Sequence, residues 1–180
     1  MCCGKGLHFK CNTDLDQNKS MTLEQKNLCI MCRAKLVANG SKEDIERLRN
    51  WTKKGKAWAM SLLGHRYRLG VGVKQSDKKA VELYEMAAKR GDAGAQAVLG
   101  GFYREGIHGL TQSYKRAFEF YTLAAEQGNA GAQSDLGVMY ATGDGIEQSN
   151  SKAREWFTKA AAQGQEEAIN ALKQFDEHGI

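Results

Sequence analysis

The sequence predicts an all-α fold, an α/α superhelical solenoid of three repeats with capping helices and a small Cys/His-rich N-terminal segment. Three segments of about 36 residues follow one another in fixed register. Each has a Leu-Gly-x-x-Tyr motif, then an Ala, an aromatic residue, an Ala pair and a closing Gly. A repeat period of 20–50 residues is typical of stacked helical units that cannot bury their apolar faces alone.

The first helix of each repeat is predicted from apolar residues at helical spacing. In the first copy Ala59, Leu63 and Tyr67 occur at i, i+4 and i+8, so they share one face. Glycines follow this stripe, as in Gly70-Val71-Gly72, and they end the helix because glycine readily adopts the dihedral angles of a tight turn. The predicted ranges are 57–69, 93–105 and 130–142.

The second helix of each repeat has the Ala, the aromatic residue and the Ala pair on one face. Its predicted ranges are 77–90, 114–127 and 150–163. We expect Asp77 and Asn150 to be N-caps, because short polar side chains accept hydrogen bonds from the first free amides of a helix. A closing glycine is expected to adopt the left-handed C-terminal cap in each copy. These glycines are Gly91, Gly128 and Gly164.

The middle copy differs from the other two by one additional residue between Tyr103 and Ala117. Tyr114 also occupies the position of Asp77 and Asn150. Because an insertion disturbs a loop less than a helix, we expect it in the loop 106–113.

Half-repeats flank the array and predict capping helices. Ile45, Leu48 and Trp51 resemble a second helix without its first, and Ala168 and Leu172 resemble a first helix without its second. A stack of repeats needs such terminal units to cover its open core. The predicted domains are the Cys/His-rich segment 1–40, a capping helix at 41–56, and the array 57–180 with its C-terminal cap.

The repeated framework resembles the Sel1-like repeat family, whose members are α/α repeats related to tetratricopeptide arrays. The resemblance covers about residues 57–172 and rests on Leu-Gly-x-x-Tyr, Gly-x-Gly-Val/Ile, Lys-Ala, Tyr-x-x-Ala-Ala and the closing Gly. It implies a right-handed superhelix that serves as an adaptor or scaffold in protein complexes. It implies no catalytic residue.

All five cysteines lie before residue 33, and their number is odd. Without a secretion signal, this favours metal binding or reduced thiols over a disulfide framework. His8 and Cys11 are two residues apart, as are Cys29 and Cys32, and four such ligands suit tetrahedral zinc. Two other interpretations stay open: Cys2 or Cys3 with Cys29, Cys32 and a borrowed ligand, or no metal at all.

The N-terminal segment also resembles the second half of a RING-type zinc domain. The resemblance implies ligand positions for Cys3, His8, Cys11, Cys29 and Cys32. It also places Arg33 where active RING ligases have an arginine that holds ubiquitin. The sequence departs from the pattern at the first Cys pair, which has no counterpart, at Lys5 in place of a ligand, and at Ile30 in place of proline. An alternative function is therefore a RING-type ubiquitin ligase, or its remnant, whose repeats select substrate.

The charge distribution argues against nucleic acid as a partner. Residues 1–56 hold 12 Lys and Arg against 6 Asp and Glu, but only two aromatic residues, Phe9 and Trp51, occur among them. No apolar run reaches the roughly 18 residues that span a bilayer, and no secretion signal is present. We therefore expect no membrane insertion and a cytoplasmic or nuclear location.

A binding module is favoured over an enzyme. The histidines stand in no motif with a nucleophile or carboxylate, and no phosphate-binding glycine loop occurs. We expect a protein or peptide on the concave face of the array. Positions on the first helices that do not repeat are free to specify that partner. The candidate residues are His65, Arg66, Arg68, Phe102, Arg104 and Met139.

Overall fold

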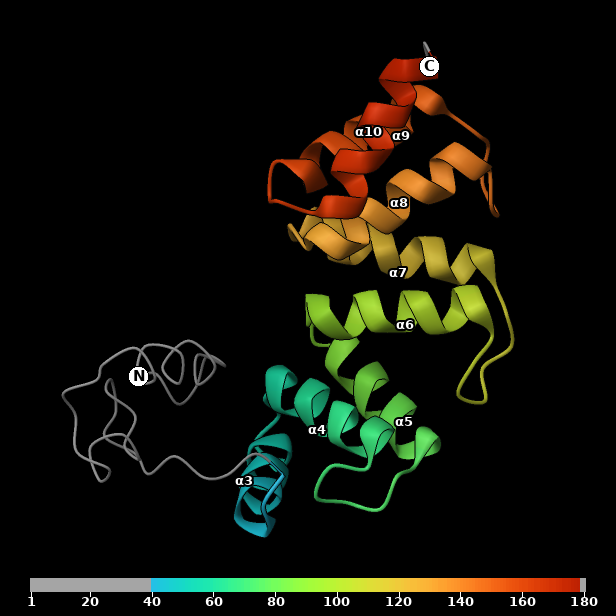
Figure 1. Ribbon diagram of the computed structural model, residues 1–180. Coiled ribbons are helices and arrows are strands. Elements are labelled where there is room, and N and C mark those ends of the chain that lie inside the picture. Colours follow the sequence, from blue (N-terminus) through green and yellow to red (C-terminus); the bar gives the residue numbers. More distant parts are fainter. Residues whose placement is uncertain (1–39, 179–180) are drawn as a thin grey trace, which may run out of the picture. The chain divides into compact units, whose positions relative to one another are not determined.

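The computed structural model describes residues 40–178, and its regular elements in that range are eight α-helices with no strand (Figure 1). They are α3 (Lys42–Lys53), α4 (Ala57–Leu69), α5 (Asp77–Ala88), α6 (Ala93–Glu105), α7 (Tyr114–Glu126), α8 (Ala130–Thr142), α9 (Asn150–Ala161) and α10 (Glu166–His178). The all-α repeat architecture is thus confirmed. The predicted first helices coincide with α4, α6 and α8, and the second helices end one or two residues earlier than predicted.

The chain divides into two compact units, residues 1–80 and 81–180. The described part of the first unit contains α3, α4 and the beginning of α5. Here α3 packs on α4 as the expected capping helix, with Ile45 and Leu48 buried. The rings of Trp51 and Trp58 lie 6.1 Å apart at the same contact. The domain boundaries expected at residues 40 and 56 stay a prediction.

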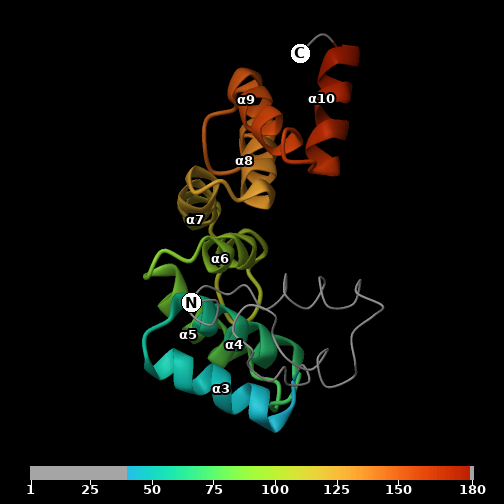
Figure 2. The same ribbon diagram turned by 90° about the vertical axis from the view of Figure 1, so that its left-hand side faces the viewer.

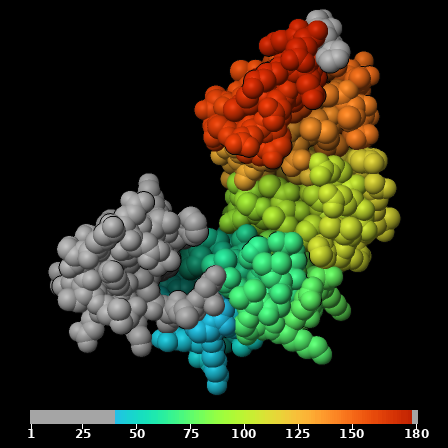
Figure 3. Space-filling model, in the orientation of Figure 1, coloured from blue at the N-terminus to red at the C-terminus, as the bar shows by residue number. Residues whose placement is uncertain are grey.

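The second unit contains the rest of α5 and the helices α6 to α10. Consecutive helices from α6 to α10 pack against one another in chain order (Figures 1 and 2). The last of them, α10, covers one end of this unit (Figure 3). Its Ala168 is buried, and its Phe175 ring makes an edge contact with Phe157 at 5.8 Å. The expected C-terminal cap is therefore present.

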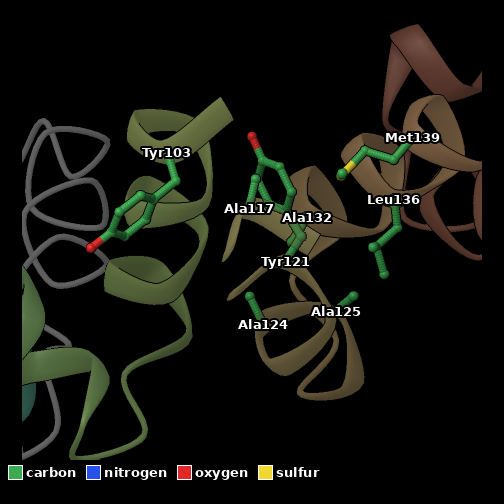
Figure 4. Packing of buried hydrophobic residues seen from close by; sticks show 8 residues of the cluster. All are labelled: Tyr103, Ala117, Tyr121, Ala124, Ala125, Ala132, Leu136 and Met139. Atoms are coloured by element: carbon green, nitrogen blue, oxygen red, sulfur yellow. The ribbon is translucent and has the colours of Figure 1, made fainter. Parts of the chain in front are cut away.

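The core of the second unit alternates small and large side chains (Figure 4). Tyr121 of α7 and Leu136 of α8 are each 1% exposed, and buried alanines surround them. Complete burial of a large apolar side chain stabilises a fold by about 1.5–3 kcal/mol. The alanines let neighbouring helices approach closely enough for the large residues to be enclosed.

The glycine of the Leu-Gly motif is explained by the aromatic residue of the same repeat. A Cβ atom on Gly137 would lie 2.5 Å from the ring of Phe157, and one on Gly100 would lie 2.7 Å from the ring of Tyr121. Real Cβ atoms do not approach rings so closely. The two framework positions are therefore coupled, because the ring occupies the space that the glycine leaves.

Serine side chains cap the second helices, so the expectation of N-caps at Asp77 and Asn150 is wrong. Ser149 Oγ accepts a hydrogen bond from the Lys152 amide, and the serines before α5 and α7 accept in the same way. Asp77 and Asn150 are instead the first residues of α5 and α9. Because the serine before Tyr114 supplies the cap, α7 can begin with a tyrosine.

The extra residue of the middle copy lies in the loop 106–113, as expected, between α6 and α7. His108 has a φ angle of 57° in this loop, and its ring lies 4.4 Å from that of Phe102. The end of the loop is unchanged by the insertion. The Ser113 amide donates to the Tyr103 carbonyl at 2.7 Å, as the Ser149 amide does to Tyr140 at 2.8 Å.

Buried glutamines link consecutive repeats of the second unit. Gln133 of α8 donates to the Ala125 carbonyl of α7 at 3.1 Å and accepts from Gln163 at 2.8 Å. Gln96 of α6 donates to the last residue of α5 at 3.3 Å and accepts from Gln127 at 2.7 Å. Gln96 and Gln133 are only 4% and 6% exposed, so these bonds satisfy amides that would otherwise be costly to bury.

Candidate partner-binding surfaces

The predicted zinc ligands lie outside the described residues. They are Cys3, His8, Cys11, Cys29 and Cys32, and the RING-like features lie in the same segment. Within residues 40–178, no group of three or more His, Cys, Asp or Glu side chains is placed to hold a metal ion. No helix in this range is long and apolar enough to cross a membrane.

Three of the six candidate partner-binding residues are buried. Phe102 is 6% exposed and packs edge-on against Tyr84 at 5.8 Å, and Met139 is 1% exposed in the core. Arg66 is 7% exposed, and its guanidinium lies 3.4 Å from the carboxylate of Asp44. These three side chains occupy equivalent positions in the three repeats and contribute to packing within their units.

The other three candidates lie at partly exposed positions on the first helices. His65 and Arg68 belong to α4, where an Arg68 guanidinium nitrogen lies 3.4 Å from His65 Nδ1. Burial lowers the pKa of His65, and the charges of Arg68 and Arg66 lower it further. The imidazole is therefore neutral at pH 7. Arg104, on α6, retains about a third of its side-chain surface.

The six candidates do not include the exposed apolar residues of the first helices. Leu62 and Leu69 on α4 are 37% and 51% exposed, and Val138 on α8 is 41% exposed. Leu62, His65 and Leu69 occur at i, i+3 and i+7, so they share one face of α4. We name Leu62, His65, Arg68 and Leu69 the α4 face. This face could have been found from the sequence, because Leu62 and Leu69 are apolar residues at positions that are not part of the repeated apolar framework.

A polar cluster joins α6 and α8 in the second unit. Arg104 donates a hydrogen bond to the Asp135 carboxylate at 2.8 Å and also contacts Glu105 at 3.2 Å. The Arg104 guanidinium lies 6.0 Å from the ring centroid of Tyr121, a residue of α7. We name Arg104, Asp135 and Val138 the α6–α8 face; Tyr121 itself is buried in the core. The face offers a hydrogen-bond donor and an acceptor next to an exposed valine.

The charges of this cluster perturb one another. Burial raises the pKa of Asp135, and the Glu105 charge adds to this effect, whereas the Arg104 charge and hydrogen bonds from Arg104 and Tyr121 lower it. The net direction is upward from 3.8. Burial is also the main cause that raises the pKa of the Tyr121 phenol. Both groups therefore favour their neutral forms more than they would in water.

Replacing Arg104 with alanine is expected to raise the pKa of Asp135 further, because the charge that stabilises the carboxylate is removed. Glu105→Gln should lower it. Since the folded pKa is raised, the Asp135 contribution to the free energy of unfolding is greatest at low pH. It declines as the pH rises from the unfolded pKa through the folded one. Titration of the Asp135 carboxyl by carbon-detected NMR measures both variants, and an unchanged or lower value in Arg104→Ala contradicts this description.

A recess of about 410 Å³ lies elsewhere in the second unit, at the loop 106–113, where Tyr103 and Arg116 line it. Arg116 donates to the Tyr103 hydroxyl at 2.9 Å, so both side chains already serve the contact between α6 and α7. A partner on the α6–α8 face would therefore lie outside this recess.

Comparison with known proteins identifies the repeats. The model of the Sel1 repeat matches residues 59–92, 93–129 and 130–165. A Sel1 repeat protein from Oxalobacter formigenes is similar in structure, with a TM-score of 0.70 and 36% identity over 73% of this chain and 98% of that one. The search of curated proteins found no match.

Two further solved structures are similar. The protein c5321, a protective antigen of uropathogenic Escherichia coli with an SLR fold, has a TM-score of 0.74 and 29% identity. The match covers 94% of this chain and 37% of that one. Cysteine rich protein B of Helicobacter pylori has a TM-score of 0.54 and 19% identity, over 71% and 96% of the two chains, and supports the fold alone. With three matched repeats that cover more than half of its length, the chain belongs to the Sel1 repeat family.

Proposed function

We propose that this protein is an interaction scaffold that binds a partner chain through exposed, non-repeating residues of its first helices. Sel1 repeat proteins generally mediate protein–protein interactions, which supports the proposal. The observation on which it depends is a contrast in burial along each first helix. Residues of the constant framework are enclosed, and several residues that differ between copies are exposed.

The contrast is large within single helices. On α8, Leu136 is 1% exposed and Val138 is 41% exposed, and on α4 the values for Leu63 and Leu69 are 4% and 51%. The framework is thus used for packing between helices. The exposed positions have no such role, so their side chains are available to select a partner.

The α6–α8 face has the chemistry of a peptide-binding surface. Arg104 and Asp135 place a donor and an acceptor side by side, and the carboxylate and guanidinium each retain about a third of their surface. Val138 adds an apolar contact. Polar groups that fix orientation beside an apolar anchor are the usual components of specific peptide recognition.

Peptide selection tests this surface. Random peptides displayed on phage are selected on the full chain, and binding of a selected peptide is measured by fluorescence anisotropy. Val138→Lys should weaken peptide binding roughly tenfold, because an apolar side chain that the bound peptide would cover is replaced by a charged one. Leu123→Lys is the matched control, since Leu123 is 48% exposed but belongs to α7. Equal loss in both variants, or loss in neither, contradicts the proposal.

Zinc binding by Cys3, His8, Cys11, Cys29 and Cys32 remains a separate prediction, as do a ligase activity and a cytoplasmic or nuclear location. None of these concerns the residues on which the scaffold proposal depends.

A further inference from the structure

We infer that the recess at the loop 106–113 holds an acidic side chain of a partner chain, and that Arg116 binds its carboxylate. The inference rests on the proposed scaffold function and specifies one contact between the two chains. It concerns the second unit alone, at a place outside the α6–α8 face. Its components are the recess, the additional loop residue of the middle copy and the arginine itself.

The recess is large enough for a side chain. Its volume is about 410 Å³, and residues 109–113 line it together with Tyr103 and Arg116. Small ligands usually bind in sites of about 300–1,000 Å³. The lining includes a leucine, a threonine, a serine and one cation. It can therefore accommodate both the methylene groups and the charge of an acidic residue.

The additional residue of the middle copy lies beside open space. His108 has a φ angle of 57° and takes the position of Gly72 and Gly145, two residues after the glycine that ends the first helix. Gly109 is then the additional residue, and it belongs to the wall of the recess. A Cβ atom on Gly109 would meet no other atom within 4 Å. Its deletion would thus give the loop the length that the other copies have, without loss of a packed side chain.

The middle copy also has an arginine where the other copies have a lysine. Each of these cations lies 5.1–5.3 Å from the ring centroid of the motif tyrosine in its own copy. The pairs are Lys79 and Tyr67, Arg116 and Tyr103, and Lys152 and Tyr140. Arginine differs from lysine because its planar guanidinium can bind one carboxylate through two parallel hydrogen bonds. The exchange adds this capacity at the recess.

Arg116 is held in place but keeps hydrogen-bond donors for a ligand. Its Nη1 donates to the Tyr103 hydroxyl at 2.9 Å, which fixes the orientation of the guanidinium. The side chain is exposed, and within residues 40–178 it has no carboxylate at ion-pair distance. Glu105, at the end of α6, contacts Arg104 instead, at 3.2 Å. The Nε and Nη2 atoms of Arg116 can therefore donate to a carboxylate in the recess.

The beginning of α7 favours an anion at this place. Its first turn contains Lys115 and Arg116 and no acidic residue, and the N-terminus of a helix itself carries partial positive charge. Residues 81–180 hold 9 Lys and Arg against 14 Asp and Glu, a net charge of −5. Salt screens exposed charges that are more than about 8–10 Å apart. An acidic side chain in the recess would therefore be held by these nearby cations and not by the net charge of the unit.

Titration with a model of the glutamate side chain tests the inference on the full chain. The probe is N-acetyl-glutamate methylamide, and its glutamine counterpart is the neutral control. We expect the glutamate probe to shift the amide resonances of residues 110–113 and the Nε–H resonance of Arg116 in NMR spectra. The glutamine probe should leave them unchanged.

Two variants and a matched control locate the site. Arg116→Lys introduces the residue of the other copies and should weaken binding of the glutamate probe at least roughly fivefold, because lysine cannot form the two parallel hydrogen bonds. Deletion of Gly109 should abolish binding, because it shortens the wall of the recess. The control, Lys152→Gln, removes the equivalent cation of the third copy, and it should bind the probe within about twofold of the wild type.

Three kinds of result would overturn the inference. Shifts with neither probe, or equal shifts with both, would mean that the recess does not recognise a carboxylate. Unchanged binding after deletion of Gly109 would place the site elsewhere. Stronger binding of inorganic phosphate, lost in Arg116→Lys, would assign the recess to a phosphate ligand. Circular dichroism confirms that each variant is folded. Val138→Lys should leave this titration unchanged, so the recess and the α6–α8 face are tested separately.

Discussion

Gly137→Ala is expected to lower the free energy of unfolding by about 1–2 kcal/mol, although alanine is the better helix former. The added methyl group would lie 2.5 Å from the Phe157 ring, closer than any ordinary van der Waals contact. Overpacking of this kind costs about 1–3 kcal/mol and occasionally more, which exceeds the roughly 1 kcal/mol that a helix gains from Gly→Ala. Urea unfolding followed by circular dichroism measures the change.

A second glycine serves as the matched control for this substitution. Gly101 is also in the middle of a helix, but a Cβ atom there would meet only the Tyr121 hydroxyl at 3.5 Å, an ordinary contact. Gly101→Ala should therefore stabilise the protein by about 0.5–1 kcal/mol. Phe157→Leu should partly rescue Gly137→Ala, because it removes ring atoms from the crowded space. Stabilisation by both alanines would show that the Gly–aromatic coupling has no energetic basis.

Gln133→Met is expected to lower the free energy of unfolding by about 1–2 kcal/mol. The substitution keeps the volume but removes two hydrogen bonds, one from the exposed Gln163 amide and one to the buried Ala125 carbonyl, which still accepts from the Gly128 amide. Each such bond contributes about 0.5–1.5 kcal/mol. Thermal and urea unfolding of the variant measure this cost.

An exposed glutamine gives the comparison for Gln133. Gln148 donates to the Ala141 carbonyl at 2.7 Å, but its side chain is exposed to water, which can replace the lost bond. Gln148→Met should therefore cost less than about 1 kcal/mol. In a double-mutant cycle, Gln133→Met and Gln163→Ala should couple, because they disrupt the same hydrogen bond. If the two changes in the free energy of unfolding are additive, the hydrogen bond between Gln133 and Gln163 does not contribute to stability.

The repeated framework could be predicted from sequence because it has one physical task in every copy. Leu63, Leu99 and Leu136 recur in phase, and their helical spacing defines a buried face independently of any partner. The glutamine hydrogen bonds between repeats were not predicted, because these residues do not recur in every copy: the first copy has Met60 where the others have Gln96 and Gln133. In addition, a polar residue beside an apolar stripe normally indicates a position that is exposed to solvent.

The candidate binding surface was predicted less completely than the fold. Non-repetition predicts exposure for all six candidates, but Arg66, Phe102 and Met139 are buried, and they differ between copies because their local packing differs. A helix turns by about 100° per residue, so a position next to an exposed one can face the core. Only the structure separates Val138, which is exposed, from Met139, which is buried. The helix caps were misplaced for a similar local reason, since a serine directly precedes Asn150, itself a good capping residue.

The central claim is that a buried, constant framework presents the non-repeating face of its first helices to a partner chain. Amide chemical-shift mapping of the full chain with a phage-selected peptide tests it most directly. We expect shifts concentrated at Gly101, Arg104, Asp135 and Val138 on α6 and α8. Shifts confined to α7 and α9, with α6 and α8 unchanged, would contradict it.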